Sequence, residues 1–141
     1  MTARIKQVTL AGGGVLGSQI AMQTAFFGFK VTVFDREPAL VKDKINKLVP
    51  VYAKFFDKSL DHVQTLADAI VYETALAPAV AQADLVMIHM GPSIMEVATH
   101  LIELANQFQT PVLVTPSVLS SNISLNFWKN VDYLAMNLAQ A

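Results

Sequence analysis

Glycines near the start of the chain constrain its fold more than any other feature. Gly12, Gly14 and Gly17 form the pattern Gly-x-Gly-x-x-Gly. The pattern follows an apolar, strand-like run at residues 5–11 and opens a helical pattern at residues 15–27. A strand, a tight glycine turn and a helix in this order are typical of the unit that binds a dinucleotide. This setting predicts an α/β fold with a nucleotide site at the turn.

Each glycine of the pattern has a distinct expected role. Gly12 allows the tight turn, Gly14 lets the backbone approach a pyrophosphate, and Gly17 lets the helix pack closely on the strand. The first turn of the helix, at Val15 and Leu16, offers backbone N–H groups to the phosphates. These five residues are therefore expected to hold the diphosphate of the ligand.

An acidic residue at the end of the next strand indicates which dinucleotide is bound. Asp35 follows Gly17 by 18 residues, close to the ~20 expected for the acid that binds the adenosine ribose. Its carboxylate would repel a 2′-phosphate, which favours NAD over NADP, although the neighbouring Arg36 weakens that preference. The predicted cofactor site, for NAD or NADH, consists of Gly12, Gly14, Val15, Leu16, Gly17, Asp35 and Arg36.

Two other interpretations of this stretch stay open at this point. The glycines could merely shape a turn, with Asp35 capping the helix that follows. A nucleoside-binding methyltransferase also has a glycine-rich first turn, but its acid tends to lie just before the first glycine, where this chain has Thr9, Leu10 and Ala11. The glycine spacing favours a dinucleotide.

Strand-like and helical patterns alternate along the rest of the chain. The strand-like runs are residues 30–34, 70–72, 84–90, 110–115 and the start of 132–141. The helical patterns are residues 39–56, 76–83, 91–107 and 120–130, with a turn or short helix at 57–68. Pro50 is expected to bend or end the first of these helices. The alternation predicts a doubly wound, Rossmann-type fold, with a mostly parallel sheet and helices on both faces, and all 141 residues fit one domain.

Composition excludes several kinds of partner. Ten basic and eleven acidic residues give a net charge of -1 without a basic cluster, so we expect no binding to nucleic acid or to an anionic membrane. The first apolar run is too short for a membrane span or a signal peptide, and the chain has no cysteine, which together fit a cytoplasmic protein. The histidines lack the spacing of metal ligands beside a third donor, so we expect no metal site.

The stretch VTLAGGGVLGSQIAMQTAFFGFKVTVFDRE, residues 8–37, resembles the start of the L-3-hydroxyacyl-CoA dehydrogenases, and most closely the bacterial 3-hydroxybutyryl-CoA dehydrogenases. The likeness continues through AQADLVMIH and through TPVLVTPSVLS, where the family has its fifth strand and a serine-rich loop. The resemblance implies an NAD-binding Rossmann domain and hydride transfer between NAD and the 3-hydroxyl of an acyl-CoA. The family's helical domain, which makes its dimer, has no counterpart in this sequence.

The resemblance places the family's catalytic positions on residues that cannot do their tasks. Its substrate-binding serine falls on Val118, with Ser117 beside it as a substitute, and its catalytic histidine falls on Asn137. An amide cannot accept the substrate proton near neutral pH. His89, at the end of a predicted strand, is the other candidate base, unless it is simply a half-buried histidine whose ring nitrogens are satisfied.

Two functions of different classes are consistent with these substitutions. The chain is the NAD-binding part of a 3-hydroxyacyl-CoA dehydrogenase, with acyl-CoA as substrate but without complete catalytic machinery of its own. Alternatively, it is a non-catalytic NAD-binding module or truncated relative that acts as a sensor or subunit. Only the first of these two functions includes catalytic turnover.

The chain is unusually apolar for its size, with 53% hydrophobic and 15% charged residues. Its C-terminal segment has few charges, and an apolar surface of this kind usually meets a partner. We therefore expect a homodimer in which Phe127, Trp128, Tyr133 or Leu138 loses exposure. In the alternative, these side chains fold back onto the sheet of a monomer.

Overall fold

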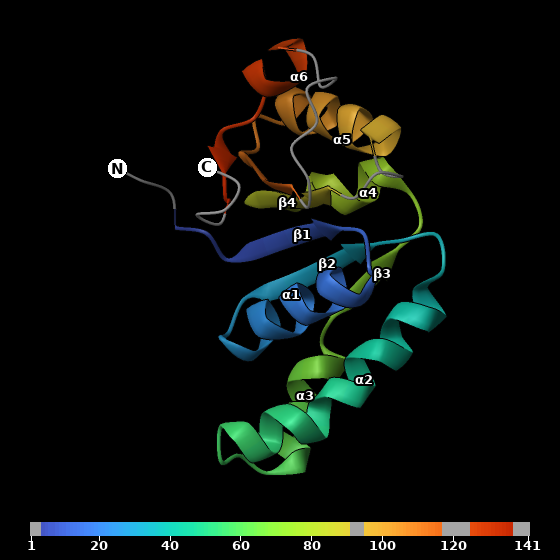
Figure 1. The fold of residues 1–141 in the computed structure, drawn as a ribbon, viewed down its shortest axis with the longest axis vertical. Coiled ribbons are helices and arrows are strands. Elements are labelled where there is room, and N and C mark those ends of the chain that lie inside the picture. The colour runs from blue at the N-terminus through green and yellow to red at the C-terminus, as the bar shows by residue number, and fades with distance from the viewer. Residues whose placement is uncertain (1–3, 91–94, 117–124, 137–141) are drawn as a thin grey trace.

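A six-stranded sheet forms the centre of the molecule (Figure 1). The computed structural model describes residues 4–90, 95–116 and 125–136. The strands are β1 (Gln7–Ala11), β2 (Lys30–Phe34), β3 (Val71–Glu73), β4 (Leu85–Met90), β5 (Val112–Pro116) and β6 (Tyr133–Leu134). Their order is β3-β2-β1-β4-β5-β6, and every neighbouring pair is parallel. This is the strand order of the Rossmann fold, so the predicted fold class is confirmed.

The order of the strands reverses beside β1. Thr9 of β1 is paired with Thr32 of β2 on one side and with Val86 of β4 on the other. From β1 the chain builds outwards to β2 and β3, and then returns to build β4, β5 and β6 in the opposite direction. In sheets of this kind the ligand crevice lies outside the carboxyl ends of the strands at the reversal.

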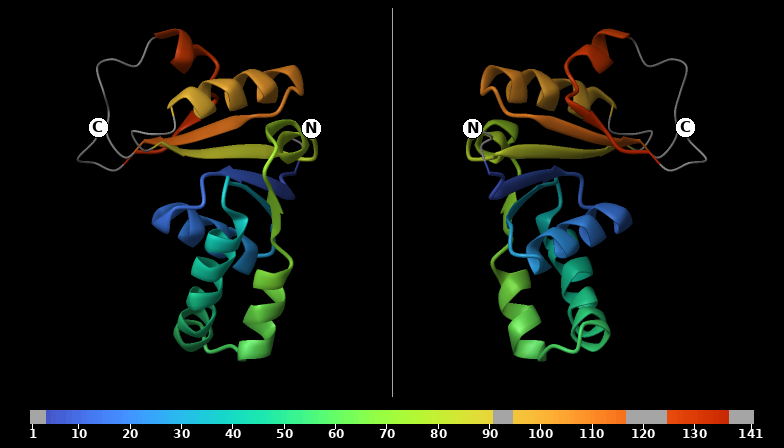
Figure 2. Two further views of the ribbon diagram at one scale, coloured as in Figure 1. Left: turned by 90° about the vertical axis from the view of Figure 1, so that its right-hand side faces the viewer. Right: turned by 90° about the vertical axis from the view of Figure 1, so that its left-hand side faces the viewer.

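Helices cover both faces of the sheet, as the side views of Figure 2 show. One face carries α1 (Val15–Phe26), α2 (Pro38–Phe55) and α3 (Leu60–Asp68). The other carries α4 (Leu76–Ala81), α5 (Met95–Gln107) and α6 (Leu125–Lys129). Successive strand residues point to opposite faces. Accordingly, Leu10 belongs to the buried cluster under α1–α3, whereas Ala11 belongs to the cluster under α4–α6.

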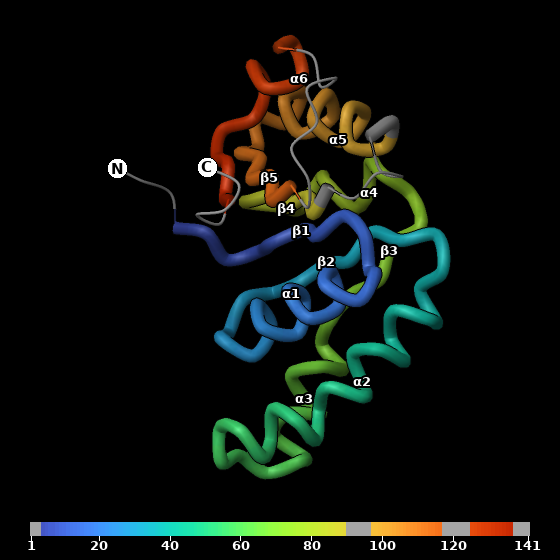
Figure 3. The backbone as a smooth tube through the Cα atoms, in the orientation of Figure 1, coloured from blue at the N-terminus to red at the C-terminus, as the bar shows by residue number. Residues whose placement is uncertain are grey.

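Pro50 lies inside α2, the longest helix. Pro50, which the sequence predicts to bend or end its helix, does not end it, since α2 continues to Phe55 and then turns back into α3 (Figure 3). A proline removes one backbone hydrogen bond from a helix. Here Ile45, Val49 and Ala53 form one buried face on both sides of Pro50, and this packing holds the helix together.

The C-terminal aromatic residues contradict part of another expectation. Phe127, named as a dimer contact, is only 7% exposed and belongs to the core cluster under α5. It packs edge-on against Trp128, with the ring centroids 5.0 Å apart. Because it is already buried within one chain, it has little exposure to lose in a dimer. Tyr133 is 57% exposed, and Leu138 lies outside the described residues.

Hydropathy along the helices gives one further finding. None of the helices within the described ranges combines the length and the apolar character needed to cross a membrane.

Candidate functional site

The glycine turn joins the carboxyl end of β1 to α1, and two of its glycines have the backbone roles that the sequence predicts. Gly12 has a φ of 92°, in the left-handed region that favours glycine, and its N–H donates to the carbonyl oxygen of Phe34. A Cβ on Gly17 would lie 2.0 Å from the carbonyl oxygen of Gly12. The absence of a side chain at Gly17 therefore lets α1 start directly against the end of β1.

Gly14 faces open space. It is the residue before the first turn of α1, and a Cβ added to it would meet nothing within 4 Å. The first N–H groups of a helix have no partner inside the helix and carry its positive dipole end. No acidic side chain lies in the first turn of α1 to neutralise that end. Val15 and Leu16, 72% and 46% exposed, flank it, so an anion can approach the backbone here.

Asp35 ties the glycine turn to the end of β2. Its Oδ2 accepts a hydrogen bond from the backbone N–H of Gly13 at 2.7 Å, and its Oδ1 accepts one from the N–H of Glu37 at 2.8 Å. The residue preceding α2 is Glu37, not Asp35, so the helix-capping interpretation is only partly met. A carboxylate oxygen has two acceptor sites, so each oxygen can accept another hydrogen bond, for example from a ribose hydroxyl.

Gly13 is a constrained residue that the sequence pattern leaves out. A Cβ on Gly13 would lie 2.2 Å from Cγ2 of Val41 in α2. Its carbonyl oxygen accepts a hydrogen bond from the buried hydroxyl of Ser18, while its N–H donates to Asp35. The signal in the sequence is the unbroken run of three glycines, since the motif itself allows any residue at this position.

A cavity of about 340 Å³ lies over the glycine turn. Four of the predicted site residues line it, namely Gly12, Gly14, Asp35 and Arg36. Val97 of α5 also lines it, and sequence reasoning missed this residue because only the fold brings α5 to the glycine turn. The cavity thus brings the glycine turn, the end of β2 and the start of α5 together.

His89 is the one candidate catalytic residue that lies within the described residues. His89 is half-buried at the carboxyl end of β4, and its Nδ1 lies 3.1 Å from Oγ1 of Thr115 on β5. One ring nitrogen therefore has a hydroxyl partner. Ser117, Val118 and Asn137 lie outside the described residues. Across the described ranges, no group of three histidine or acidic side chains could hold a metal ion.

Comparison with known proteins identifies the family of this site. The model of the NAD-binding domain of 3-hydroxyacyl-CoA dehydrogenase matches residues 7–125. A diketoreductase whose structure is described in terms of dual catalysis of dicarbonyl compounds is 33% identical, with a TM-score of 0.82 over 96% of this chain and 50% of its own. No curated protein sequence matches significantly.

Two more distant structures have the same fold. The 3-hydroxybutyryl-CoA dehydrogenase of Escherichia coli K12 is 20% identical, with a TM-score of 0.72 over 95% of this chain and 29% of its own. The (S)-3-hydroxybutyryl-CoA dehydrogenase of Ralstonia eutropha is 15% identical, with a TM-score of 0.73 over 92% of this chain and 46% of its own. This chain thus spans half or less of the length of these three proteins.

Proposed function

We propose that this chain, which belongs to the 3-hydroxyacyl-CoA dehydrogenase family as an NAD-binding domain, holds its NAD at the turn between β1 and α1, for hydride transfer to or from a 3-hydroxyacyl-CoA. The family membership favours this function over a non-catalytic module. When bound, NAD supplies the hydride acceptor at its nicotinamide ring, and NADH supplies the donor. The chain's own residues bind and orient the adenosine and diphosphate portions.

The open surface of Gly14 beside the start of α1 is the observation that carries this proposal. A pyrophosphate fits there because no Cβ blocks the backbone and the dipole end of α1 is positive. Val15 and Leu16 present backbone N–H groups to it. Asp35 accepts hydrogen bonds from the adenosine ribose, and its charge disfavours a 2′-phosphate, so NAD is preferred to NADP even with Arg36 on the rim.

The proton of the proposed reaction requires a base, and the family resemblance places the catalytic histidine on Asn137, whose amide cannot accept that proton. His89 lies at the carboxyl end of β4, on the same edge of the sheet as the glycine turn. It stays a candidate for contact with the acyl-CoA, as does Ser117. The proposal therefore assigns NAD binding to this chain. It assigns the complete proton relay to side chains other than His89 and Ser117.

The proposal extends to assembly and location. β6 is a strand of two residues at the edge of the sheet, paired on one side with β5. Tyr133 and Leu134 in this strand and Met136 directly after it are between 40% and 57% exposed. Exposed apolar side chains at a sheet edge favour association, so we propose a homodimer through Trp128 and Tyr133 in the cytoplasm.

The test is calorimetric titration of NAD and NADP into the chain and into two variants. Asp35→Ala is expected to weaken NAD binding by about 10- to 100-fold, since each hydrogen bond to a charged group contributes about 1.5–3 kcal/mol. It should also reduce the preference for NAD over NADP. Asp84→Ala is a matched control, because Asp84 also accepts two backbone hydrogen bonds but lies at the opposite end of the sheet.

Two results would contradict the proposal. Equal weakening by the two variants would mean that Asp35 acts only by holding the backbone. No binding of NAD to the unaltered chain at millimolar concentration would remove the proposed site altogether.

A further inference from the structure

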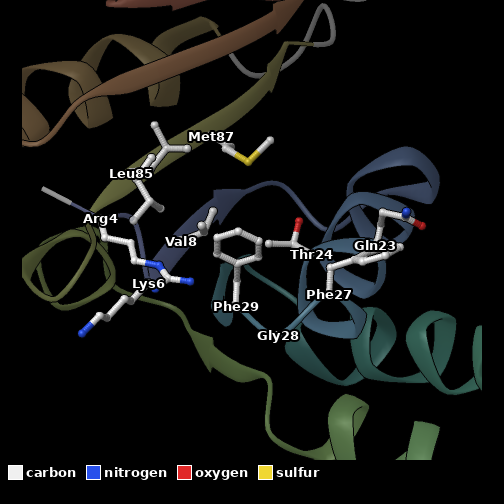
Figure 4. Close-up of a pocket in the computed structure, with 11 residues that line it drawn as sticks. Arg4, Lys6, Val8, Gln23, Thr24, Phe27, Gly28, Phe29, Leu85 and Met87 are labelled. Atoms are coloured by element: carbon white, nitrogen blue, oxygen red, sulfur yellow. The ribbon is translucent and has the colours of Figure 1, made fainter. Parts of the chain in front are cut away.

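A second and larger cavity, of about 860 Å³, lies at the amino-terminal end of the sheet (Figure 4). Its lining comes from the chain around β1, from β4 and from the end of α1 with the turn that follows. It is separated from the glycine turn by the five residues of β1, a length of roughly 16 Å. The proposed NAD site does not use it, and its volume is within the range of small-molecule sites.

The floor of this cavity is apolar. Val8 of β1 is paired with Leu85 of β4, and Met87 lies two residues further along the same strand. These three side chains point to the α1 side of the sheet, whereas the alternate residues Val86 and Ile88 are buried under α5 on the other side. Figure 4 shows Val8 and Met87 beside the ring of Phe29.

The end of α1 forms one wall through a specific helix-ending turn. Gly28 has a φ of 97°, and its N–H donates to the carbonyl oxygen of Ala25, while the N–H of Phe29 donates to that of Thr24. This pair of hydrogen bonds is the Schellman motif, which requires a left-handed residue and so favours glycine. The turn places Phe27 and Phe29, 57% and 39% exposed, on the same side of the cavity.

Two cations lie at the edge of the apolar floor. Arg4 and Lys6 line the cavity just before β1, and neither forms an ion pair with another described residue. Asp84 lies close to Lys6, but its Oδ2 already accepts the backbone N–H groups of Lys6 and Gln7 at 2.9 Å. The cavity therefore combines aliphatic and aromatic side chains with two positive charges, of which that of Lys6 also attracts the carboxylate of Asp84.

We propose that this cavity binds an amphipathic anion, specifically a fatty carboxylate. Its hydrocarbon chain lies on Val8, Leu85 and Met87, beside the rings of the helix-ending turn. Its carboxylate lies between Arg4 and Lys6, where charge-assisted hydrogen bonds fix the orientation. Burial of apolar surface supplies affinity, and the two cations supply selectivity for an anion.

Two other occupants fit the cavity less well. A second copy of the chain, related by a two-fold axis through the cavity, would set Arg4 and Lys6 against the same cations of its partner. A helix of 10–12 Å diameter fills roughly 400–600 Å³ per turn, so the cavity of about 860 Å³ would take only about one and a half to two turns. A fatty carboxylate satisfies both the apolar floor and the charged rim.

The test is calorimetric titration with dodecanoate below its micelle concentration, compared with dodecyltrimethylammonium, which has the same hydrocarbon chain and the opposite charge. One dodecanoate is expected to bind per chain, at least tenfold more tightly than the cation. The double variant Arg4→Glu with Lys6→Glu should weaken dodecanoate binding at least tenfold and leave NAD binding unchanged. The matched control, Lys42→Glu with Lys54→Glu, reverses two exposed charges on α2 and should leave both unchanged.

Three results would overturn this inference. Equal affinity for the anion and the cation would mean that the cavity takes up any hydrocarbon chain. Equal weakening by the two double variants would mean that net charge alone attracts dodecanoate. Sedimentation that shows a dimer dissociated by the Arg4 and Lys6 changes would assign the cavity to a second copy. If the unaltered chain binds dodecanoate but does not bind NAD, only the proposed function is contradicted, since the two sites lie at opposite ends of β1.

Discussion

Two aspartates, one at each end of the sheet, have the same hydrogen-bonding arrangement in different surroundings. Asp35 follows β2 at the carboxyl edge and accepts the backbone N–H groups of Gly13 and Glu37 at 2.7 and 2.8 Å. Asp84 precedes β4 at the amino edge and accepts the N–H groups of Lys6 and Gln7, both at 2.9 Å. Each carboxylate holds the backbone of a neighbouring segment in place. Hydrogen bonding alone therefore does not distinguish the site from the scaffold.

The surroundings of the two carboxylates make the difference. Asp35 lies beside a glycine turn with open backbone and beside the positive end of α1, so a dinucleotide can reach it. Asp84 lies beside the start of β1, whose N–H groups it satisfies. Backbone hydrogen bonds, from Gln7 first and then Lys6, lower the pKa of Asp84, so this carboxylate is ionised at neutral pH. The open backbone beside Asp35, and not its hydrogen bonds, is therefore what distinguishes the proposed ribose-binding acid from Asp84.

The largest effect is expected from a side chain added within the glycine turn. Gly17→Ala places a Cβ about 2.0 Å from the carbonyl oxygen of Gly12, so the turn must move. We expect the free energy of unfolding to fall by about 2–4 kcal/mol, and NAD binding to be lost with the geometry of the turn. Urea unfolding and NAD titration measure the two effects. A variant with unaltered stability would show that α1 and β1 do not pack through this residue.

Gly14→Ala is expected to change NAD affinity without a large change in the free energy of unfolding. The added methyl group points into open space, so the free energy of unfolding should change by no more than about 1 kcal/mol, the usual effect of alanine before a helix. NAD affinity should fall at least tenfold, because the methyl group occupies the approach of the pyrophosphate. The same two titrations measure this. Unchanged NAD affinity would place the pyrophosphate elsewhere.

The smallest expected effect concerns the amino edge. The folded protein lowers the pKa of Asp84, so its ionised form stabilises the fold at pH values above the ordinary aspartate pKa of about 3.9. That stabilisation is lost as the pH falls through the lower pKa of the folded state. Asp84→Asn should therefore be less stable than the unaltered chain near neutral pH, and the difference should shrink in acid. Urea unfolding over a pH series measures it, and a difference independent of pH would contradict the assignment.

The sequence predicted most of the fold because its patterns are local. The apolar run of β4 and the glycine turn before α1 are read within a few residues of chain. Pro50 does not end its helix because packing competes with the local rule for proline, and the buried face of α2 is packed only once α1 and α3 lie against it. The prediction that Phe127 loses exposure in a dimer was wrong because hydrophobicity alone does not distinguish a core residue from an interface residue.

The residues of the candidate site also fall into those that local spacing predicts and those that only tertiary contacts bring together. Spacing alone identified Gly12, Gly17 and Asp35, because the turn, the close packing and the end of β2 recur at regular distances along the chain. The contact of Gly13 with Val41 and the approach of Val97 to the cavity could not be predicted, because α2 and α5 reach the turn only through the sheet.

By itself, the sequence determined the alternation of strands and helices, the glycine turn and the acid that follows it, because these depend on backbone sterics and on the periodicity of neighbouring residues. Only the tertiary structure decided that Asp35 holds Gly13 in place, that Phe127 is buried, and that Arg4 and Lys6 border an apolar cavity. Such contacts depend on which distant segments the parallel sheet brings together, and no local sequence pattern specifies those segments.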